Sequence, residues 1–372
     1  MNKLKDITVL VSACGYQFMP ALADCLKNNG ERNIRIVGTD MNYDETILQM
    51  VDAFYQVPKA KDPTYCDVVL DICKKEKVDI ILPTMSAELI PLLDNIDRFK
   101  EIGVVISISN RNSIEITNNK LNFYNFMKDN NLPMVDFYPV NTIEEVKEAF
   151  VRLGYPNKAI CIKALESSGS RGIRIIDPTK SRYDILFNEK PNSFYISYEE
   201  LITILSEKDT IPQMVVMEAI PGNEFSVDLV ADNGKVLYMC ARQSNTIIAS
   251  IPQTATLYEE KKAYKICEDV VRLLKIDGNA DFDFKYDANN NPILMEVNPR
   301  IAATMAIFKA GGMNLPYLRI KQLLKEDLPT VNVKYGVKMV RRYIDMFSNY
   351  WTSDFSNPKI NLYNFEAIVN KK

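Results

Sequence analysis

Histidine is absent from the 372-residue sequence. Its absence excludes Ser-His-Asp and Cys-His catalysis, zinc sites with imidazole ligands and imidazole general bases. Any chemistry must therefore use carboxylates, lysine, arginine, hydroxyls, thiols or a metal ion that prefers oxygen ligands.

Paired cysteine motifs are also lacking. The seven cysteines contain no Cys-x-x-Cys pair, and an odd, dispersed number favours reduced thiols. Cys14 lies in a glycine-containing loop and is the one cysteine considered as a nucleophile. Without a histidine to activate its thiol, a small buried residue is the favoured interpretation.

Long apolar segments and basic clusters are missing as well. The apolar run at residues 7–11 is too short for a signal peptide or a membrane span. The net charge is -3, and the longest basic runs have two residues, which argues against a nucleic-acid partner. We expect a cytoplasmic protein with neither nucleic-acid nor membrane partners. Its 47% hydrophobic composition is that of a globular protein with two or three domains.

The first part of the chain alternates short apolar runs with helical patterns, which predicts an α/β domain with a parallel sheet. The loop after its first strand contains Gly15 but not Gly-x-Gly-x-x-Gly, although Asp40 stands where a ribose-binding acid would fall. Nicotinamide binding is therefore a disfavoured alternative. The expected strands are residues 7–11, 34–37, 80–82 and 104–108, and the expected domain is 1–112.

After residue 112 the pattern changes to helices followed by hairpins. Thr142 and Glu145 form a capping box that opens a helix, and Asn233-Gly234 predicts a tight hairpin turn. We expect strands at 160–163, 173–176, 214–218, 224–231, 235–242, 280–286 and 293–297, with a helix at about 259–275.

The segment 281–300 carries the clearest chemical signal. A symmetric hairpin with its turn between Asn289 and Asn290 places Asp283 opposite Glu296. Two carboxylates about 5 Å apart repel by roughly 3 kcal/mol, so a compensating cation is expected. Asn298 follows on the same face, which completes an oxygen-rich set suited to Mg²⁺. Arg300 could bind a phosphate. A solvent-facing polar edge is the alternative, but residues Phe282, Phe284, Met295 and Val297 form an apolar opposite face.

Two further segments carry weaker signals. Lys163 ends a strand before a loop that contains Gly169, Ser170 and Gly172, small residues that let backbone amides approach a phosphate. A plain hairpin loop is the alternative. After Pro221-Gly222, Glu224 could accept hydrogen bonds from a ribose, although a plain amphipathic strand is the favoured interpretation of this segment by itself. Ser226 and Asp228 share the face of Glu224.

In this order the segments resemble the ATP-grasp superfamily, in its carbamoyl-phosphate-synthetase-like branch. The resemblance covers residues 1 to about 325 and includes Asn119-Lys120-Leu121 opening a helix and Gly311–Pro316 after the acidic hairpin. It implies an N-terminal Rossmann-like parallel sheet followed by a two-lobed ATP-grasp fold. The implied limits are 1–112, 113–325 with a lid at about 155–220, and a C-terminal extension 326–372.

The resemblance also implies roles for individual residues. Lys120 and Lys163 would contact ATP phosphates, and Arg300 would stabilise the transferred phosphoryl group, with Arg242 a weaker candidate for phosphate or substrate contact. Asp283, Glu296 and Asn298 would bind Mg²⁺, two ions in relatives, with Mn²⁺ an alternative. The phosphate lid would contain Ser168, Gly169, Ser170 and Gly172, the adenine pocket Glu218, Ala219 and Ile220, and the ribose site Glu224.

The implied activity is that of a carboxylate–amine ligase that forms an acyl phosphate and releases ADP and phosphate. The substrates would be an amino acid or small carboxylic acid and an amine. The loop 12–15 and Glu88 are expected to help form the acceptor site, and a homodimer is possible. The chain has one such unit rather than two in tandem, and Ala302 and Ala303 replace glycines common in relatives. A carboxyphosphate- or carbamoyl-phosphate-forming enzyme and a nucleotide-binding regulatory protein remain alternatives.

Overall fold

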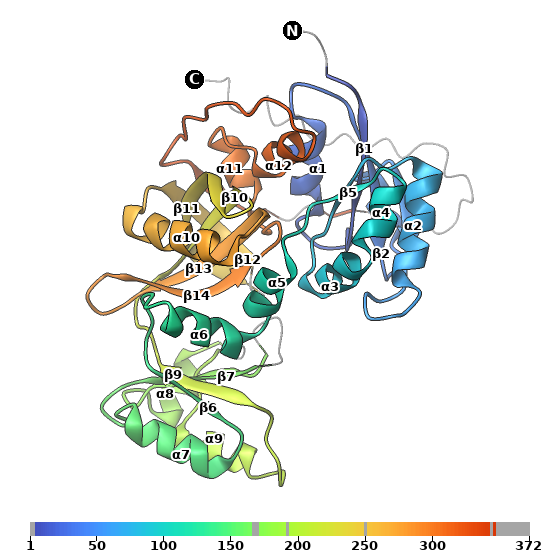
Figure 1. Cartoon of the computed structure of the whole chain (residues 1–372). Helices are drawn as coiled ribbons and strands as arrows, with labels where there is room; N and C mark the ends of the chain where they lie inside the picture. Colours follow the sequence, from blue (N-terminus) through green and yellow to red (C-terminus); the bar gives the residue numbers. More distant parts are fainter. Residues whose placement is uncertain (1–3, 166–170, 191–192, 249–250, 343–344, 347–372) are drawn as a thin grey trace. The chain divides into compact units, whose positions relative to one another are not determined.

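The computed structural model describes residues 4–165, 171–190, 193–248, 251–342 and 345–346. The predicted lid residues Ser168, Gly169 and Ser170 lie outside these ranges. The chain divides into two compact units, the first built on residues up to Ser107 and the second on Ile108–Val340 (Figure 1). No helix in the described ranges is long and apolar enough to cross a membrane.

The first unit contains a parallel sheet with the order β3-β2-β1-β4-β5. Central strand β1 pairs with β2 on one side and β4 on the other, and its side chains Val9 and Leu10 are fully buried. The predicted parallel sheet is therefore confirmed. The strands are β1 (Ile7–Val11), β2 (Ile34–Asp40), β3 (Ala53–Gln56), β4 (Ile80–Leu82) and β5 (Val105–Ile106); the helices are α1 (Met19–Lys27), α2 (Tyr65–Glu76), α3 (Ser86–Asp94) and α4 (Ile96–Glu101), with a 3-10 turn η1 (Glu45–Gln49).

The strand order reverses between β1 and β4, the place where open α/β sheets commonly bind ligands. Here the chain's own side chains fill that place. Ser12, which follows β1, donates its hydroxyl hydrogen to the Glu88 carboxylate in the first turn of α3. The backbone N–H of Thr84 donates to Ser12 Oγ over 3.0 Å, and Thr84 Oγ1 donates to the Ser12 carbonyl over 2.7 Å. All three residues are buried.

The Glu88 carboxyl group should make the stability of the first unit depend on pH. Burial raises its pKa to about 7 from 4.5, although hydrogen bonds from Ser12 and Tyr65 favour the ionised form. The folded state thus binds more protons than the unfolded state between these values. We expect the free energy of unfolding to fall by up to about 3 kcal/mol as pH rises across this window. Urea unfolding of the full chain at a series of pH values measures this loss.

The Glu88→Gln variant removes the titrating group while retaining a hydrogen-bonding side chain. Its unfolding free energy should change much less between pH 5 and pH 8 than that of the native chain. Glu101→Gln, at an exposed position of the same unit, should keep the native pH dependence. Equal pH dependence in native and Glu88→Gln proteins would contradict the assignment.

The second unit contains two antiparallel sheets. The smaller has the order β6-β9-β7-β8, and α7 packs on it with Val146, Ala149 and Phe150. A capping box in which Thr142 and Glu145 bond each other's backbone amides opens α7, as predicted. Its elements are β6 (Phe137–Val140), α7 (Ile143–Arg152), β7 (Ile160–Ala164), β8 (Ile173–Ile176), α8 (Arg182–Asn188), α9 (Tyr198–Leu205) and β9 (Met214–Glu218).

The larger sheet has the order β14-β13-β10-β11-β12-β15. Helix α10 covers it with an apolar stripe that includes Ile266, Val270 and Leu274, and Figure 1 shows α10 beside these strands. The strands are β10 (Glu224–Asp232), β11 (Lys235–Ile248), β12 (Ile251–Tyr258), β13 (Gly278–Tyr286), β14 (Pro292–Asn298) and β15 (Lys338–Val340). The helices are α5 (Arg111–Asn118), α6 (Lys120–Asp129), α10 (Lys261–Leu274), α11 (Ala306–Ala310) and α12 (Leu315–Leu323).

The β13–β14 hairpin differs from the symmetric one that we predicted. The strands close with Tyr286 opposite Pro292, and an irregularity in register follows before Asp283 faces Glu296. The extra residue in β14 leaves Leu294 opposite Phe284 and fully buried, whereas Met295 is only half-buried. The predicted carboxylate pair is therefore present, and Met295 packs against the core as a half-buried residue, while Leu294 is the fully buried one.

Candidate functional site

One face of the larger sheet carries a row of polar side chains from β14 to β11. Asp283 lies opposite Glu296, and its neighbour in β10 is Ser226. Ser226 Oγ donates to Asp283 Oδ1 over 2.6 Å, and Asn298 Nδ2 lies 3.4 Å from Asp283 Oδ2. Asp283, Glu296 and Asn298 are half-buried, so their side chains remain accessible to a ligand.

These three residues fit a divalent cation. Two carboxylates and one amide oxygen on the same sheet face match the oxygen ligands that Mg²⁺ prefers. Within the described ranges no group of three Asp, Glu, Cys or His side chains could hold a metal, so Asn298 would be needed as the third ligand. Its Oδ1 accepts from Arg300 Nη2 over 3.2 Å. The hydrogen bond between Arg300 and Asn298 thus links the three candidate metal ligands to a guanidinium.

Arg242 lies deeper on the same face and is only 4% exposed. Its Nε donates to Asp228 Oδ2 over 2.8 Å, and its Nη2 donates to Asp281 Oδ1 over 3.2 Å. Its Nη1 donates to Ser244 Oγ over 3.2 Å. Each nitrogen of the guanidinium thus donates to a protein group, which gives Arg242 a structural role in addition to the phosphate or substrate contact for which it is a weaker candidate.

Burial and mutual repulsion control the ionisation of the two acids that Arg242 joins. Burial raises the pKa of Asp228 to about 6, against the opposing effect of the Arg242 charge. Burial, followed by the charges of Asp283 and Asp228, raises the pKa of Asp281 well above its usual range. Burial disfavours the charge on Arg242, but Asp228, Asp281 and Asp283 together raise its pKa. The positive charge of Arg242 therefore offsets the repulsion among the neighbouring carboxyl groups of Asp228, Asp281 and Asp283.

Lys163 belongs to the smaller sheet and bonds a tyrosine of α6. It lies in β7, and its Nζ donates to the Tyr124 hydroxyl oxygen over 3.1 Å. Burial opposes its charge, whereas Tyr124 and, more weakly, Glu296 raise its pKa above the ordinary value. Tyr124 lies one turn after Lys120, the first residue of α6. The helix opens at this segment, as predicted, and Asn119 caps it by accepting from the Asn122 backbone N–H over 3.0 Å.

The predicted phosphate loop is anchored at its described end by Gly172. Its φ is +69°, a conformation that favours glycine, and a Cβ there would lie 2.6 Å from the Ala164 Cβ. The backbone N–H of Ala164 donates to the Gly172 carbonyl over 2.9 Å, which closes the β7–β8 hairpin. Gly172 is thus required for the turn itself, whatever the loop binds.

The segment between β9 and β10 is fixed by a close backbone approach. The Gly222 N–H donates to the Tyr286 carbonyl over 2.9 Å. On either side of Gly222, Glu218 forms an ion pair with Lys158 at 3.0 Å and Glu224 one with Lys285 at 3.5 Å. The predicted adenine and ribose residues therefore lie on a segment that is attached to β13 through glycine.

Substitution of Gly222 by alanine should disrupt this attachment. The new Cβ would lie 2.3 Å from the Tyr286 carbonyl oxygen, a distance that forces the backbone to move. We expect a loss of roughly 2 kcal/mol of unfolding free energy and weaker nucleotide binding, because the segment 218–224 must shift. Urea unfolding and a fluorescent ATP-analogue titration measure the two effects. Gly103→Ala, at a positive φ with open space around it, is the control for the general cost of losing glycine. An unchanged Gly222→Ala protein would contradict the argument.

Two family models match separate parts of the chain. Residues 9–107 match the family described as "PylC-like, N-terminal domain". Residues 210–343 match the family described as "ATP-grasp in the biosynthetic pathway with Ter operon". The chain thus contains an ATP-grasp domain. The matched region includes the polar row from Arg242 to Asn298 and the segment with Gly222.

Curated relatives support the same assignment. The chain is 24% identical over 300 residues to the carbamoyl phosphate synthase large chain of Clostridium acetobutylicum, covering 77% of this chain and 26% of the relative. It is 22% identical over 295 residues to that of Methanothermobacter thermautotrophicus, covering 74% and 25%. The aligned part of this chain therefore covers about a quarter of the length of these relatives.

Solved structures share the fold. An N5-carboxyaminoimidazole ribonucleotide synthetase bound to ADP aligns with a TM-score of 0.61 at 15% identity, over 90% of this chain and 81% of that one. The biotin carboxylase domain of Hydrogenobacter thermophilus 2-oxoglutarate carboxylase aligns with 0.63 at 18%, over 89% and 73%. An L-amino acid ligase from Bacillus licheniformis aligns with 0.60 at 15%, over 87% and 75%. The predicted parallel sheet followed by an ATP-grasp fold is confirmed.

Some residues that bond the candidate site residues were not singled out from the sequence. Tyr124 bonds Lys163, and Ser226 bonds Asp283, although neither belongs to a recognised motif. The alternation of β10 placed Ser226 and Asp228 on the polar face and was the available signal. Asp281, by the same alternation in β13, could have been added to the row.

Two candidates in the N-terminal domain have structural roles. Asp40 accepts backbone N–H groups from Gly15 over 3.0 Å and from Asn42 over 2.9 Å, so its carboxylate is not free for a ribose. This geometry further disfavours nicotinamide binding. Cys14 is buried, and burial, then the Asp40 charge, raises its thiol pKa to about 12, which makes it a poor nucleophile. All seven cysteines are buried.

Proposed function

We propose that the protein is an ATP-dependent carboxylate–amine ligase that activates a carboxylate as an acyl phosphate. The observation that carries the proposal is the half-exposed set of Asp283, Glu296 and Asn298, linked to Arg300, in an ATP-grasp domain. Like charges placed opposite each other in a hairpin are costly without a cation between them. Related folds include an L-amino acid ligase and synthetases bound to ADP, which fits this reaction class.

In this proposal Asp283, Glu296 and Asn298 hold Mg²⁺, which supplies positive charge against the ATP phosphates. Arg300 binds the oxygens of the phosphoryl group that is being transferred, and Lys163 and Lys120 bind the remaining phosphates. A substrate carboxylate oxygen attacks the γ-phosphorus, and the bond to the ADP oxygen breaks. An amine then attacks the acyl carbon, loses a proton and displaces inorganic phosphate.

For the nucleotide base and sugar, we propose Glu218, Ala219 and Ile220 around the adenine and Glu224 at the ribose. Glu224 is exposed and near Lys285, whose charge orients the carboxylate without burying it. A carboxylate in this state can accept hydrogen bonds from vicinal hydroxyls. Lys163 bonds the Tyr124 hydroxyl, and the charge of Glu296 contributes to the raised pKa of Lys163, which supports a place for this lysine near the same site.

The test is an ADP-release screen with purified protein, ATP and Mg²⁺. Amino acids and small carboxylic acids are supplied singly and in pairs with amines, and bicarbonate forms a separate arm. Release that requires an organic acid and an amine supports the ligase. The curated relatives favour a second candidate, a carboxyphosphate-forming enzyme, because they are carbamoyl phosphate synthases. Release with bicarbonate alone would replace the ligase by this candidate.

A further inference from the structure

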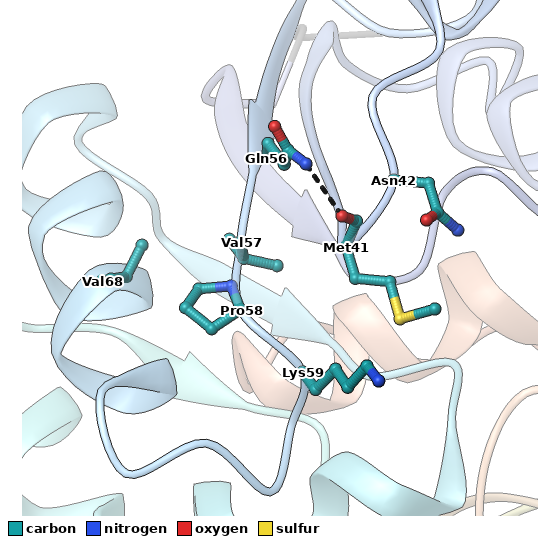
Figure 2. A pocket seen from close by; sticks show the side chains of 7 residues that line it. All are labelled: Met41, Asn42, Gln56, Val57, Pro58, Lys59 and Val68. Carbon is teal, nitrogen blue, oxygen red and sulfur yellow. Dashed lines mark hydrogen bonds between the residues drawn. The ribbon is translucent and has the colours of Figure 1, made fainter.

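A pocket of about 480 Å³ lies in the N-terminal domain. Its lining does not include Ser12, Thr84 or Glu88, the buried residues at the position between β1 and β4 where the strand order reverses. The pocket is formed where β2 and β3 end, at the carboxyl edge of the parallel sheet. Figure 2 shows the segment 56–59 running between α2, which carries Val68, and the segment that carries Met41 and Asn42. Its walls include Met41, Asn42, Gln56, Pro58, Lys59 and Val68.

The shape of the pocket is fixed by backbone contacts. Gln56 Nε2 donates to the Met41 carbonyl over 3.0 Å, and the Val57 N–H donates to the Asp40 carbonyl over 2.9 Å (Figure 2). Asp40 is itself fixed by the N–H groups of Gly15 and Asn42. The two loops are thus joined before any ligand arrives, and a pre-formed pocket reduces the entropy lost on binding.

The chemistry of the walls is that of an amphiphilic anion site. Lys59 is the one charged residue among those that line the pocket; it is exposed and forms no ion pair with any described residue. The amides of Asn42 and Gln56 add polar groups beside it, while Met41, Pro58 and Val68 are apolar. The pocket has a volume in the range of small-molecule sites, one positively charged side chain and an apolar wall. These properties suit an organic carboxylate.

A second observation comes from the exposed apolar side chains of this domain. The three most exposed large ones among its described residues are Tyr43 at 56%, Met41 at 49% and Tyr16 at 46%. All three lie on loops that follow β1 and β2, at the same edge of the sheet as the pocket. Apolar side chains gathered at one exposed edge are typical of a binding surface.

We propose that this pocket binds a small organic carboxylate with an apolar side chain, with Lys59 pairing with its carboxylate and Met41 and Val68 contacting its apolar part. The proposal is independent of the ligase function and would hold for a protein without catalytic activity. Ligase turnover therefore does not test it.

The test uses the full chain labelled at its methionine methyl groups with ¹³C and titrated with 4-methylpentanoate. The Met41 resonance is assigned from the Met41→Leu spectrum. We expect it to shift saturably, and we expect Lys59→Gln to weaken the apparent affinity about fivefold, the size of an exposed ion pair. Lys61→Gln, an exposed lysine outside the pocket, should bind as the native chain does.

4-Methylpentanamide has the same shape without the charge and should bind more weakly than the acid. The proposal fails if the Met41 resonance does not move, or if the acid and the amide bind equally. It also fails if Lys59→Gln and Lys61→Gln weaken binding by the same factor, because the attraction would then be non-specific.

Discussion

Replacement of Glu296 by glutamine should reduce ADP release by at least about a thousandfold while leaving the fold intact. The variant removes one charge from the proposed cation site, and groups that stabilise developing charge in a transition state contribute effects of this size. The side chain keeps its length and its position opposite Asp283. Initial rates of ADP release at saturating ATP, with the substrates found in the screen, measure the effect.

The same substitution should not destabilise the protein. A neutral amide opposite Asp283 removes the repulsion between two carboxylates, so the urea midpoint without Mg²⁺ should equal or exceed that of the native chain. Glu268→Gln, at an exposed position of α10, should change neither property. Turnover at the native rate in Glu296→Gln would eliminate the metal-site assignment, and a large loss of stability would show a structural role instead.

Replacement of Arg242 by methionine should cost about 3–5 kcal/mol of unfolding free energy. Methionine fills much of the same volume but leaves Asp228 and Asp281 buried without their cation, and removal of one partner from a buried ion pair has costs of this order. Urea unfolding of the full chain at pH 7 measures the loss. Arg272→Met removes an exposed arginine from its pair with Asp269 and should cost less than about 1 kcal/mol.

A second substitution distinguishes lost charge balance from lost packing. Adding Asp228→Asn to Arg242→Met removes one of the two uncompensated carboxylates and should restore part of the stability. The double-mutant cycle over Asp228 and Arg242 should thus give a clear coupling energy. Additive losses would indicate that the guanidinium acts mainly by filling space.

The local pattern of the acidic hairpin was sufficient to predict that Asp283 faces Glu296. Alternation placed Asp283 and Asn298 on one face, and the turn residues Asp287–Pro292 limited the possible registers. What the pattern could not show was the bulge, because the choice between Leu294 and Met295 for the core depends on the side chains of other strands and of α10. The turn is one residue shorter than the symmetric hairpin, and the bulge restores the register at Glu296.

Contacts between distant parts of the chain account for what the sequence could not reveal. Arg242 meets Asp281 across 39 positions, and Ser12 meets Glu88 across 76. The alternation of β11 could not tell whether Arg242 faces solvent, a ligand or two buried acids. Asp40 was placed correctly at the end of a strand, but its two backbone partners depend on the conformations of the loops at Gly15 and Asn42.

The pairing of β10 has a consequence for synthesis on the ribosome. This strand forms its hairpin with β11 almost at once, but its other edge pairs with β13, where Glu224 faces Lys285. Until β13 emerges, the unpaired edge of β10 presents free N–H and C=O groups to other nascent chains. Glu224, Ser226 and Asp228 lie on one face of β10, and these polar side chains make the exposed strand a poor template for aggregation. Glu224, which we propose for the ribose, would thus also help to protect the protein while it is being made.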